Sequence, residues 1–203
     1  TMLAFLTCDV GIEKNLWDKM IKEASQLSFN AISVDGDTST NDSFLAINSG
    51  DQISHKYLPV IQEGINYICQ HLAQSIARDG EGSNCLLEVL VTGIKDNLDA
   101  LKIAKSIVNS SLVKTAVHGC DPNWGRIVAA AGNAGIEFNL ANLDLFIGDF
   151  QILKKGNLLA FSEDMIINYM REKMTGRYLI NDTVKITLNF NNGNAQAKAW
   201  GCD

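Results

Sequence analysis

Amphipathic helical patterns alternate with short apolar strands along this chain. Apolar side chains recur at three- and four-residue steps over residues 13–27, 57–78 and 97–108, which predicts three helices. On the second helix, the stripe expected to be buried comprises Ile61, Ile65, Ile68, Leu72 and Ile76. Helices interleaved with strands in this way predict an α/β or α+β fold.

The strands and the fourth helix follow from shorter patterns. Apolar or alternating runs predict strands over residues 31–34, 86–92, 184–190 and 195–200, and short strands joined by a hairpin turn at 154–157 within residues 143–160. The Asn- and Gly-rich segment 191–194 is expected to turn the strand over 184–190 into its partner over 195–200. Ser162 stands where it can cap a helix over 163–174.

Charge and cysteine usage exclude several classes of protein. The 203 residues carry a formal net charge of −6 and no cluster of Lys or Arg, which argues against a nucleic-acid surface. No apolar run approaches the roughly 20 residues of a membrane helix. Five widely spaced cysteines fit neither a disulfide framework nor a zinc site. We therefore expect reduced thiols, no bound metal and a cytoplasmic protein, with a reducing organelle equally compatible.

The first residues have an unusual order. Thr1 precedes Met2, and the apolar residues 2–6 are typical of a strand that enters a core rather than a frayed terminus. We therefore expect Thr1 to mark a break in a longer strand, although a cloning boundary is the simpler alternative. Because residues 200–203 lie in or just after a predicted strand, we also expect further chain beyond Asp203.

A threonine in first position carries two reactive groups. Its hydroxyl can attack a carbonyl, and its α-amine, with an ordinary pKa of about 7.7–8.0, can accept the hydroxyl proton. The β-methyl group also restricts χ1 and so limits the orientations of the hydroxyl. The same hydroxyl could attack the preceding peptide carbonyl of a precursor and thereby release the amine. Thr1 is the candidate catalytic residue.

Two polar blocks admit both structural and functional interpretations. Residues 35–42 contain three carboxylates but lack the spacing of a calcium loop, so a turn network that positions Thr1 or the neighbouring strand is favoured over a metal site. In the block 118–126, a turn with a buried Trp124 and a hydrogen-bonded Arg126 is at least as compatible as a ligand contact. His118 is interpreted as structural.

Four blocks together resemble the ornithine acetyltransferase (glutamate N-acetyltransferase) family of arginine biosynthesis. They match in order and spacing across essentially the whole chain, and the second and fourth are the most specific. The blocks are residues 1–7 (TMLAFLT), 34–42 (VDGDTSTND), 79–82 (DGEG) and 112–127 (LVKTA running into GCDPNWGRI). The chain resembles the β chain that remains after self-cleavage of a precursor.

The resemblance implies an architecture and partners. It implies a self-cleaving N-terminal-nucleophile sandwich of αββα type completed by an α chain, followed by a smaller C-terminal α/β domain. Residues 1–85 would belong to the shared nucleophile domain and residues 86–203 to the C-terminal domain. The implied assembly is an α2β2 heterotetramer with the α chain from the same precursor. No nucleic acid, membrane or resident cofactor is implied.

The resemblance also implies a reaction. Thr1 would take an acetyl group from N-acetylornithine and pass it to glutamate, and some members use acetyl-CoA as a second donor. Glu81 matches the position where the family places a substrate-binding carboxylate, and a fixed anion suits substrates that carry an ammonium group. The oxyanion hole would lie in the α chain. Residues 83–85 (Ser-Asn-Cys) depart from the Ala-Thr-Lys usual in the family, which puts the local charge balance in question.

Two other functions remain open at this point. An amidase or aminopeptidase of the related self-cleaving fold would use water in place of glutamate as the acyl acceptor. A non-catalytic binding subunit would undergo cleavage only as maturation, and Thr1 would then have no role in turnover.

Overall fold

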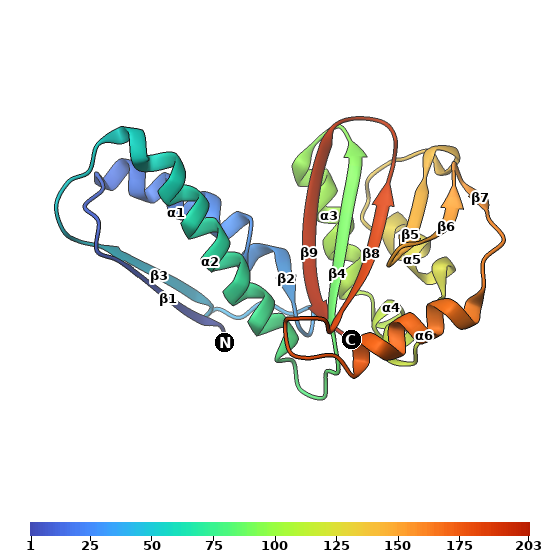
Figure 1. Cartoon of the computed structure of the whole chain (residues 1–203). Helices are drawn as coiled ribbons and strands as arrows, with labels where there is room; N and C mark the ends of the chain where they lie inside the picture. Colours follow the sequence, from blue (N-terminus) through green and yellow to red (C-terminus); the bar gives the residue numbers. More distant parts are fainter. The chain divides into compact units, whose positions relative to one another are not determined.

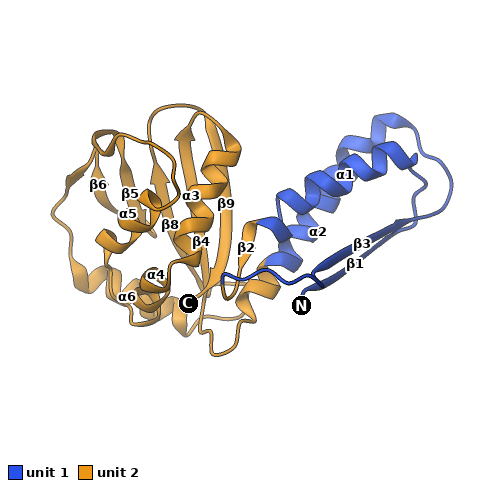
Figure 2. Ribbon diagram, turned by 180° about the vertical axis from the view of Figure 1, so that it is seen from behind, with its two compact units in different colours: residues 1–30, 36–73 blue, residues 31–35, 74–203 orange.

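The computed structural model describes residues 1–203, which form two compact units (Figure 2). Unit 1 comprises residues 1–30 and 36–73, and unit 2 comprises residues 31–35 and 74–203. The boundary at residue 74 falls inside the long helix α2 (Leu58–Arg78). The predicted domain boundary between residues 85 and 86 refers to a nucleophile domain shared with an α chain, and it stays a prediction.

Unit 1 packs helices against one face of a two-stranded sheet. Strands β1 (Leu3–Cys8) and β3 (Ser43–Asn48) run parallel, and Leu3 pairs with Ser43 at their start. Helix α1 (Lys14–Gln26) is tied to the sheet by Trp17, whose indole N–H donates to the Ala46 carbonyl at 3.3 Å. The α2 residue Gln62 donates to the Met20 carbonyl of α1 at 3.2 Å. The core of unit 1 is therefore built between one sheet face and these helices.

The other face of the two-stranded sheet is apolar and open. Alternation along each strand places Leu3, Phe5, Leu45 and Ile47 on this face, with exposed fractions of 60%, 66%, 56% and 65%. Parallel strands are ordinarily covered on both faces, and a two-stranded sheet is marginal in water. The open face of β1 and β3 is thus an exposed apolar patch of the kind that marks an interaction site.

Unit 2 is a seven-stranded mixed sheet with the order β2-β9-β4-β8-β5-β6-β7 (Figure 1). The strands are β2 (Ile32–Ser33), β4 (Leu86–Ile94), β5 (Asp144–Ile147), β6 (Phe150–Lys154), β7 (Asn157–Leu158), β8 (Thr183–Asn189) and β9 (Ala195–Cys202). The central strand β4 pairs parallel with β8 and antiparallel with β9. The mixed α/β class predicted from the sequence is confirmed.

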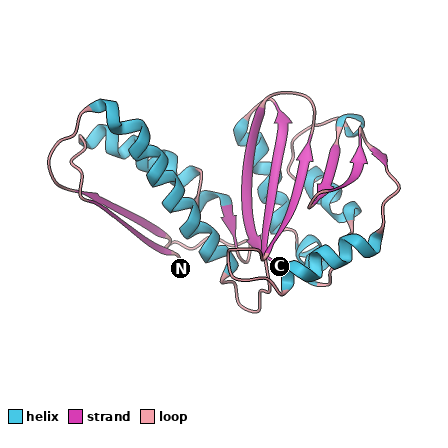
Figure 3. Cartoon of the chain, viewed as in Figure 1, coloured by secondary structure: helices cyan, strands magenta, loops and turns pink.

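One face of the unit 2 sheet carries the main core. The buried row Leu87, Val89 and Val91 of β4 joins Ile186 and Leu188 of β8 in a cluster that also contains buried residues of four helices. These helices are α3 (Asn97–Asn109), α4 (Ser111–His118), α5 (Trp124–Gly132) and α6 (Glu163–Met174), all visible in Figure 3. A smaller cluster on the other face joins Leu86 and Trp200 to Ala31 and Ala77.

The helices expected over 13–27, 57–78, 97–108 and 163–174 are confirmed as α1, α2, α3 and α6. Ser162 occupies the N-cap position of α6 but its side chain makes no capping hydrogen bond. Strand β3 and helices α4 and α5 were not predicted. The hairpin turn expected at 154–157 is confirmed, with Lys155 and Gly156 at positive φ angles.

Two predictions about packing are wrong. Strands β8 and β9 are not partners, because β4 lies between them and the segment 190–194 crosses its end. There Phe190 N–H donates to the Thr92 carbonyl and Asn192 N–H to the Gly93 carbonyl. On α2, Ile68 is 46% exposed, and Ile65 shares the buried row with three small residues, Cys69, Ala73 and Ala77. Small side chains let the helix approach its neighbours closely, so Cys69, Ala73 and Ala77 are buried beside the correctly predicted Ile65, and Ile68 is not.

Three further properties bear on function. All five cysteines are free thiols. The structure contains no group of three or more His, Cys, Asp or Glu residues that could hold a metal ion. None of the helices combines the length and the apolar character needed to span a membrane.

Candidate active site

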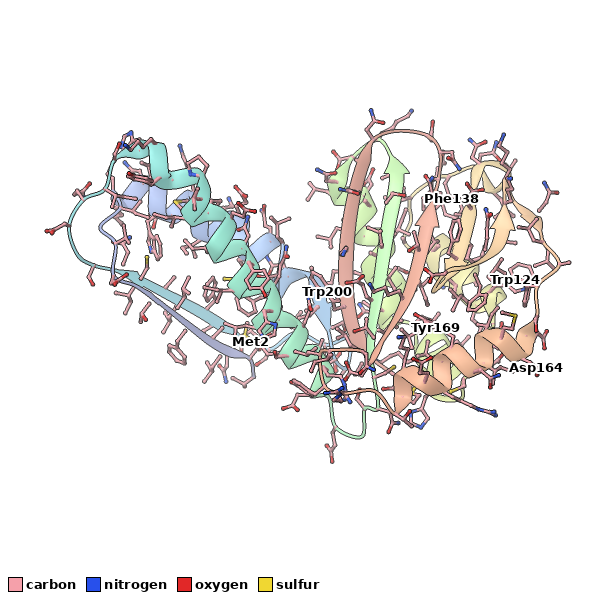
Figure 4. All side chains as sticks on the ribbon, viewed as in Figure 1. Met2, Trp124, Phe138, Asp164, Tyr169 and Trp200 are labelled. Atoms are coloured by element: carbon pink, nitrogen blue, oxygen red, sulfur yellow. The ribbon has the colours of Figure 1, made fainter.

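Thr1 precedes the first strand of unit 1 and is exposed. The next residue, Met2, labelled in Figure 4, is held by the strand partner on both sides of its backbone. Its N–H donates to Asp42 Oδ1 at 2.7 Å, and its carbonyl accepts from the Ser43 N–H at 2.8 Å. The chain is therefore fixed one residue after the candidate nucleophile.

The segment before β3 forms a network of side-chain and backbone hydrogen bonds. Asp42 Oδ2 accepts from the Ser39 N–H at 3.2 Å, and Ser39 Oγ accepts from the Asn41 N–H at 3.1 Å. Ser43 Oγ donates to the Asn41 carbonyl at 3.2 Å. The turn network predicted for this block is confirmed over residues 39–43, and it meets the chain next to Thr1 through Asp42.

The carboxyl group of Asp42 is stabilised in its ionised form. The hydrogen bond from the Met2 N–H, followed by that from the Ser39 N–H, holds the pKa of this carboxyl below its ordinary value. The positive charge of the chain terminus acts in the same direction. At neutral pH Asp42 therefore presents two charged acceptor oxygens to the backbone around it.

Glu81 lies at an exposed turn directly after α2, in unit 2. The Ser83 N–H donates to the Gly80 carbonyl at 3.0 Å, and Gly82 adopts a φ of 77°, which favours glycine. The α2 residue Arg78 ties down the segment that follows. Its guanidinium donates to the carbonyls of Ser83 and Asn84 at 3.0 and 2.9 Å and pairs with the buried Asp182.

A buried carboxylate holds the same segment from its amide side. Asp203 Oδ1 accepts from the N–H groups of Asn84 and Cys85 at 2.7 and 2.9 Å and from Ser83 Oγ at 2.8 Å. Its second oxygen lies 2.8 Å from His118 Nδ1. The turn that presents Glu81 is thus followed by a segment fixed by a cation on its carbonyls and an anion on its amides.

The residues that depart from the family pattern belong to this network. Ser83 and Asn84 contact Asp203 through side chain and backbone, and the Asn84 side chain also lies 3.3 Å from His118 Nδ1. Cys85 is fully buried, and burial, followed by the charge of Asp203, raises the pKa of its thiol. Position 85 therefore adds no charge, while the Arg78 cation lies against the carbonyls of Ser83 and Asn84.

The block around residues 118–126 supports the helices of unit 2. Asn123 caps α5 by accepting from the Arg126 N–H, and the Arg126 guanidinium donates to the Leu112 carbonyl at 3.0 Å and to Thr115 Oγ1 at 3.3 Å. Half-buried Trp124 packs against the main core (Figure 4). These contacts agree with the structural interpretation of Asn123, Trp124 and Arg126.

Thr1 and Glu81 lie in different units, each with its own support. Asp42, Arg78 and Asp203 were not singled out from the sequence, because their partners lie 40 residues away for Asp42 and as many as 120 for Asp203. The dense run of Asp, Ser, Thr and Asn at 35–43 was the one local signal that could have pointed to Asp42.

The mixed seven-stranded sheet and the helices packed on it place the chain among mixed α/β proteins. Residues 1–203 match the ArgJ family over their whole length. The chain belongs to the ArgJ family.

Individual relatives agree with this assignment. The chain is 64% identical to the arginine biosynthesis bifunctional protein ArgJ of Prochlorococcus marinus subsp. pastoris over 203 residues, and 49% identical to ArgJ 1 of Nostoc sp. over 209. These matches cover 100% of the chain but 50% and 51% of the relatives, so the chain spans about half the length of the curated relatives it matches.

A crystal structure of the arginine biosynthesis bifunctional protein ArgJ from Bacillus halodurans matches the fold. The TM-score is 0.90 at 38% sequence identity, and the alignment covers 100% of this chain and 94% of the solved one. At this identity the likeness extends beyond the fold to the family.

Proposed function

We propose that this chain is the β chain of an acetyltransferase of arginine biosynthesis. It would move an acetyl group from N-acetylornithine to glutamate through an ester on Thr1. The observation that carries the proposal is an exposed threonine just before strand β1, next to the anchored Met2, in a chain of the ArgJ family.

The chemistry assigns two roles to Thr1. Its Oγ attacks the acetyl carbonyl, its α-amine accepts the hydroxyl proton, and the C–N bond of N-acetylornithine breaks as that proton passes to the departing ornithine amine. The glutamate amine then attacks the ester, the C–O bond breaks, and Thr1 Oγ recovers its proton. Both steps create an oxyanion, and the proposed α chain would supply the donors that stabilise it.

Glu81 is proposed to bind the ammonium group of the substrates. It is exposed and carries a negative charge, and the segment behind it is fixed by Arg78 and Asp203. A fixed anion lowers the entropy cost of orienting an amino-acid substrate. We propose no resident cofactor, and acetyl-CoA would enter only as a second acetyl donor.

A second chain from the same precursor is the proposed partner. The open apolar face of β1 and β3 supports this, since a sandwich with an α chain would cover it. The relation in length also supports it. The curated relatives are about twice as long as this chain, whereas the solved Bacillus chain is matched over 94% of its own length. The proposed assembly is an α2β2 heterotetramer with an N-terminal-nucleophile sandwich, in the cytoplasm.

The test is acetyl transfer by the two-chain protein. With N-acetylornithine and glutamate we expect N-acetylglutamate, and with N-acetylornithine alone an adduct of about 42 Da on this chain. Thr1→Ala should abolish both the adduct and precursor cleavage. Free acetate without N-acetylglutamate would favour the amidase alternative, which the relatives named above do not support. Full turnover by the Thr1→Ala variant would remove Thr1 from the mechanism.

The role of Glu81 is tested separately. Loss of one charge-assisted partner is expected to weaken amino-acid binding by about 1–3 kcal/mol, so Glu81→Gln should raise KM about tenfold with a smaller change in kcat. Glu172→Gln removes another exposed carboxylate, on α6, and serves as the matched control. An unchanged KM for both amino acids would contradict the assignment.

A further inference from the structure

At the start of β1, the outermost hydrogen bond to the partner segment is accepted by a side chain and not by the main chain. The ladder between β1 and β3 begins at Leu3 and Ser43, and the Ser43 N–H donates to the Met2 carbonyl. One step further out, the Met2 N–H finds no main-chain acceptor on β3 and donates to the Asp42 carboxylate instead, at 2.7 Å. Asp42 thus extends the strand pairing to the peptide bond between Thr1 and Met2.

Fixing that peptide bond constrains the nucleophile. The peptide unit is planar, so an anchored Met2 N–H also fixes the carbonyl carbon of Thr1. The hydroxyl is then placed by two torsions of Thr1, ψ and χ1, and χ1 is restricted by the β-methyl group. The α-amine depends on ψ alone. The positions of both reactive groups of Thr1 therefore depend on the peptide unit that Asp42 holds.

Asp42 is itself held in place. Its second carboxylate oxygen accepts from the Ser39 N–H at 3.2 Å, and its own N–H donates to the Ser39 carbonyl at 3.3 Å. The Asn41 N–H is bonded to Ser39 Oγ in turn. The carboxylate is anchored from both sides, so it acts as a rigid support rather than a mobile acceptor.

We infer that Asp42 is a positioning residue for Thr1, acting through the Met2 N–H to aim the hydroxyl and amine of the nucleophile. The inference rests on the proposed function and deepens it. In this role Asp42 would neither contact the acetyl group nor take a proton. It would serve two reactions that use the same hydroxyl, self-cleavage of the precursor and acetyl transfer.

Self-cleavage places the same demand on geometry. Thr1 Oγ attacks the preceding carbonyl, an ester bond forms, the peptide C–N bond breaks, and the hydroxyl proton ends on the released nitrogen. Water then hydrolyses the ester, which returns the hydroxyl and leaves a free amine. Because Met2 is on the retained side of the broken bond, the same Asp42 contact can act before and after cleavage.

The test measures both reactions in variants of the full-length protein. Asp42→Ala should slow precursor cleavage and lower kcat by about 10–100-fold with KM within about twofold, as expected when a nucleophile is misplaced by about 1 Å. Asp42→Asn keeps one oxygen for the Met2 N–H but turns an amide toward Ser39, so its kcat should lie between those of Asp42→Ala and the parent. Asp18→Asn removes an exposed carboxylate of α1 and should change neither rate.

A structural readout separates positioning from general damage. In Asp42→Ala, hydrogen exchange of the peptide covering residues 1–8 should quicken while that of α1 stays as in the parent. If Asp42→Ala fails to mature, the kcat of Asp42→Asn decides. Parental cleavage and kcat in Asp42→Ala, a change confined to KM, or an equal loss in Asp18→Asn would overturn the inference. Absence of acetyl transfer in the parent would refute the proposed function, while the cleavage rates would still test Asp42.

Discussion

At the scale of single residues, donors from three consecutive residues and from His118 converge on the buried carboxylate of Asp203. The donors are the Ser83 hydroxyl and the N–H groups of Asn84 and Cys85. Burial alone would raise the pKa of this carboxyl, but the hydrogen bonds, led by that from the Cys85 N–H, outweigh it and lower the pKa below its ordinary value. The ionised form of Asp203 therefore stabilises the segment behind Glu81.

This direction of shift predicts how stability depends on pH. An Asp carboxyl has a pKa of about 3.9 when unfolded, and in the folded protein the pKa of Asp203 is lower. Its contribution is then fully present above the unfolded value and is lost as pH falls through the folded value. Asp203→Asn should cost about 1–3 kcal/mol at pH 5, and the difference from the parent should shrink toward pH 3.

Thermal midpoints of the two-chain protein between pH 5 and pH 3 measure this effect. Asp149→Asn removes an exposed carboxylate of unit 2 and provides the control. A difference between Asp203→Asn and the parent that stays constant down to pH 3 would contradict the prediction.

At the same scale, the sequence could indicate residues with their own chemistry but not the residues that hold them. Thr1 follows from its position and its two reactive groups, and Glu81 from the family resemblance. Asp203, and Asp42 in its bond to Met2, accept from backbone groups far away along the chain, and such a contact leaves no local pattern. In the sequence, Arg78 is likewise only a cation in the last turn of a helix. Its bonds to the carbonyls of Ser83 and Asn84 are seen only in the structure.

At the scale of elements, helices with a long apolar stripe were predicted correctly because their period is local. Strand neighbours were not, since pairing is decided by elements distant in sequence. A short turn at 191–194 predicts a hairpin, yet β4, about 100 residues earlier, occupies the place between β8 and β9. Residues 190–192 do not form a hairpin turn and instead donate hydrogen bonds to Thr92 and Gly93 near the end of β4.

Burial on α2 shows a second limit of local patterns. Hydrophobicity favours Ile68 as a core residue, whereas Cys69, Ala73 and Ala77 are the buried ones. Close packing rewards a fit of volume as well as apolar character. The exposed Val60, Tyr67 and Ile68 of α2 consequently remain on the surface of this chain.

At the scale of the whole molecule, the two units differ in how much buried core and strand pairing stabilises them. The largest buried cluster lies in unit 2, where β4 has a partner strand on each side. In unit 1, β1 and β3 pair only with each other, and one face of the pair exposes Leu3, Phe5, Leu45 and Ile47. Two strands open on one face are marginal without further cover.

This asymmetry predicts which amides respond to the proposed partner chain. Compared with the separated chain, the assembled protein should show exchange slowed at least about tenfold in β1 and β3, because local opening there no longer exposes an unsupported strand pair. The amides of β4 should exchange at similar rates in both states, since their neighbours β8 and β9 belong to the same chain. Hydrogen exchange followed by peptide mass spectrometry resolves the two regions.

A pair of variants makes the assignment specific to the open face. Phe5→Ser, on the exposed side of β1, should reduce both the protection of β1 and the amount of α chain that co-purifies, because a buried aromatic contact is lost. Leu98→Ser removes a similarly exposed apolar side chain from α3 in unit 2 and should change neither. If β1 and β3 were equally protected with and without the α chain, that chain would cover another surface, and the proposed sandwich would have to be abandoned.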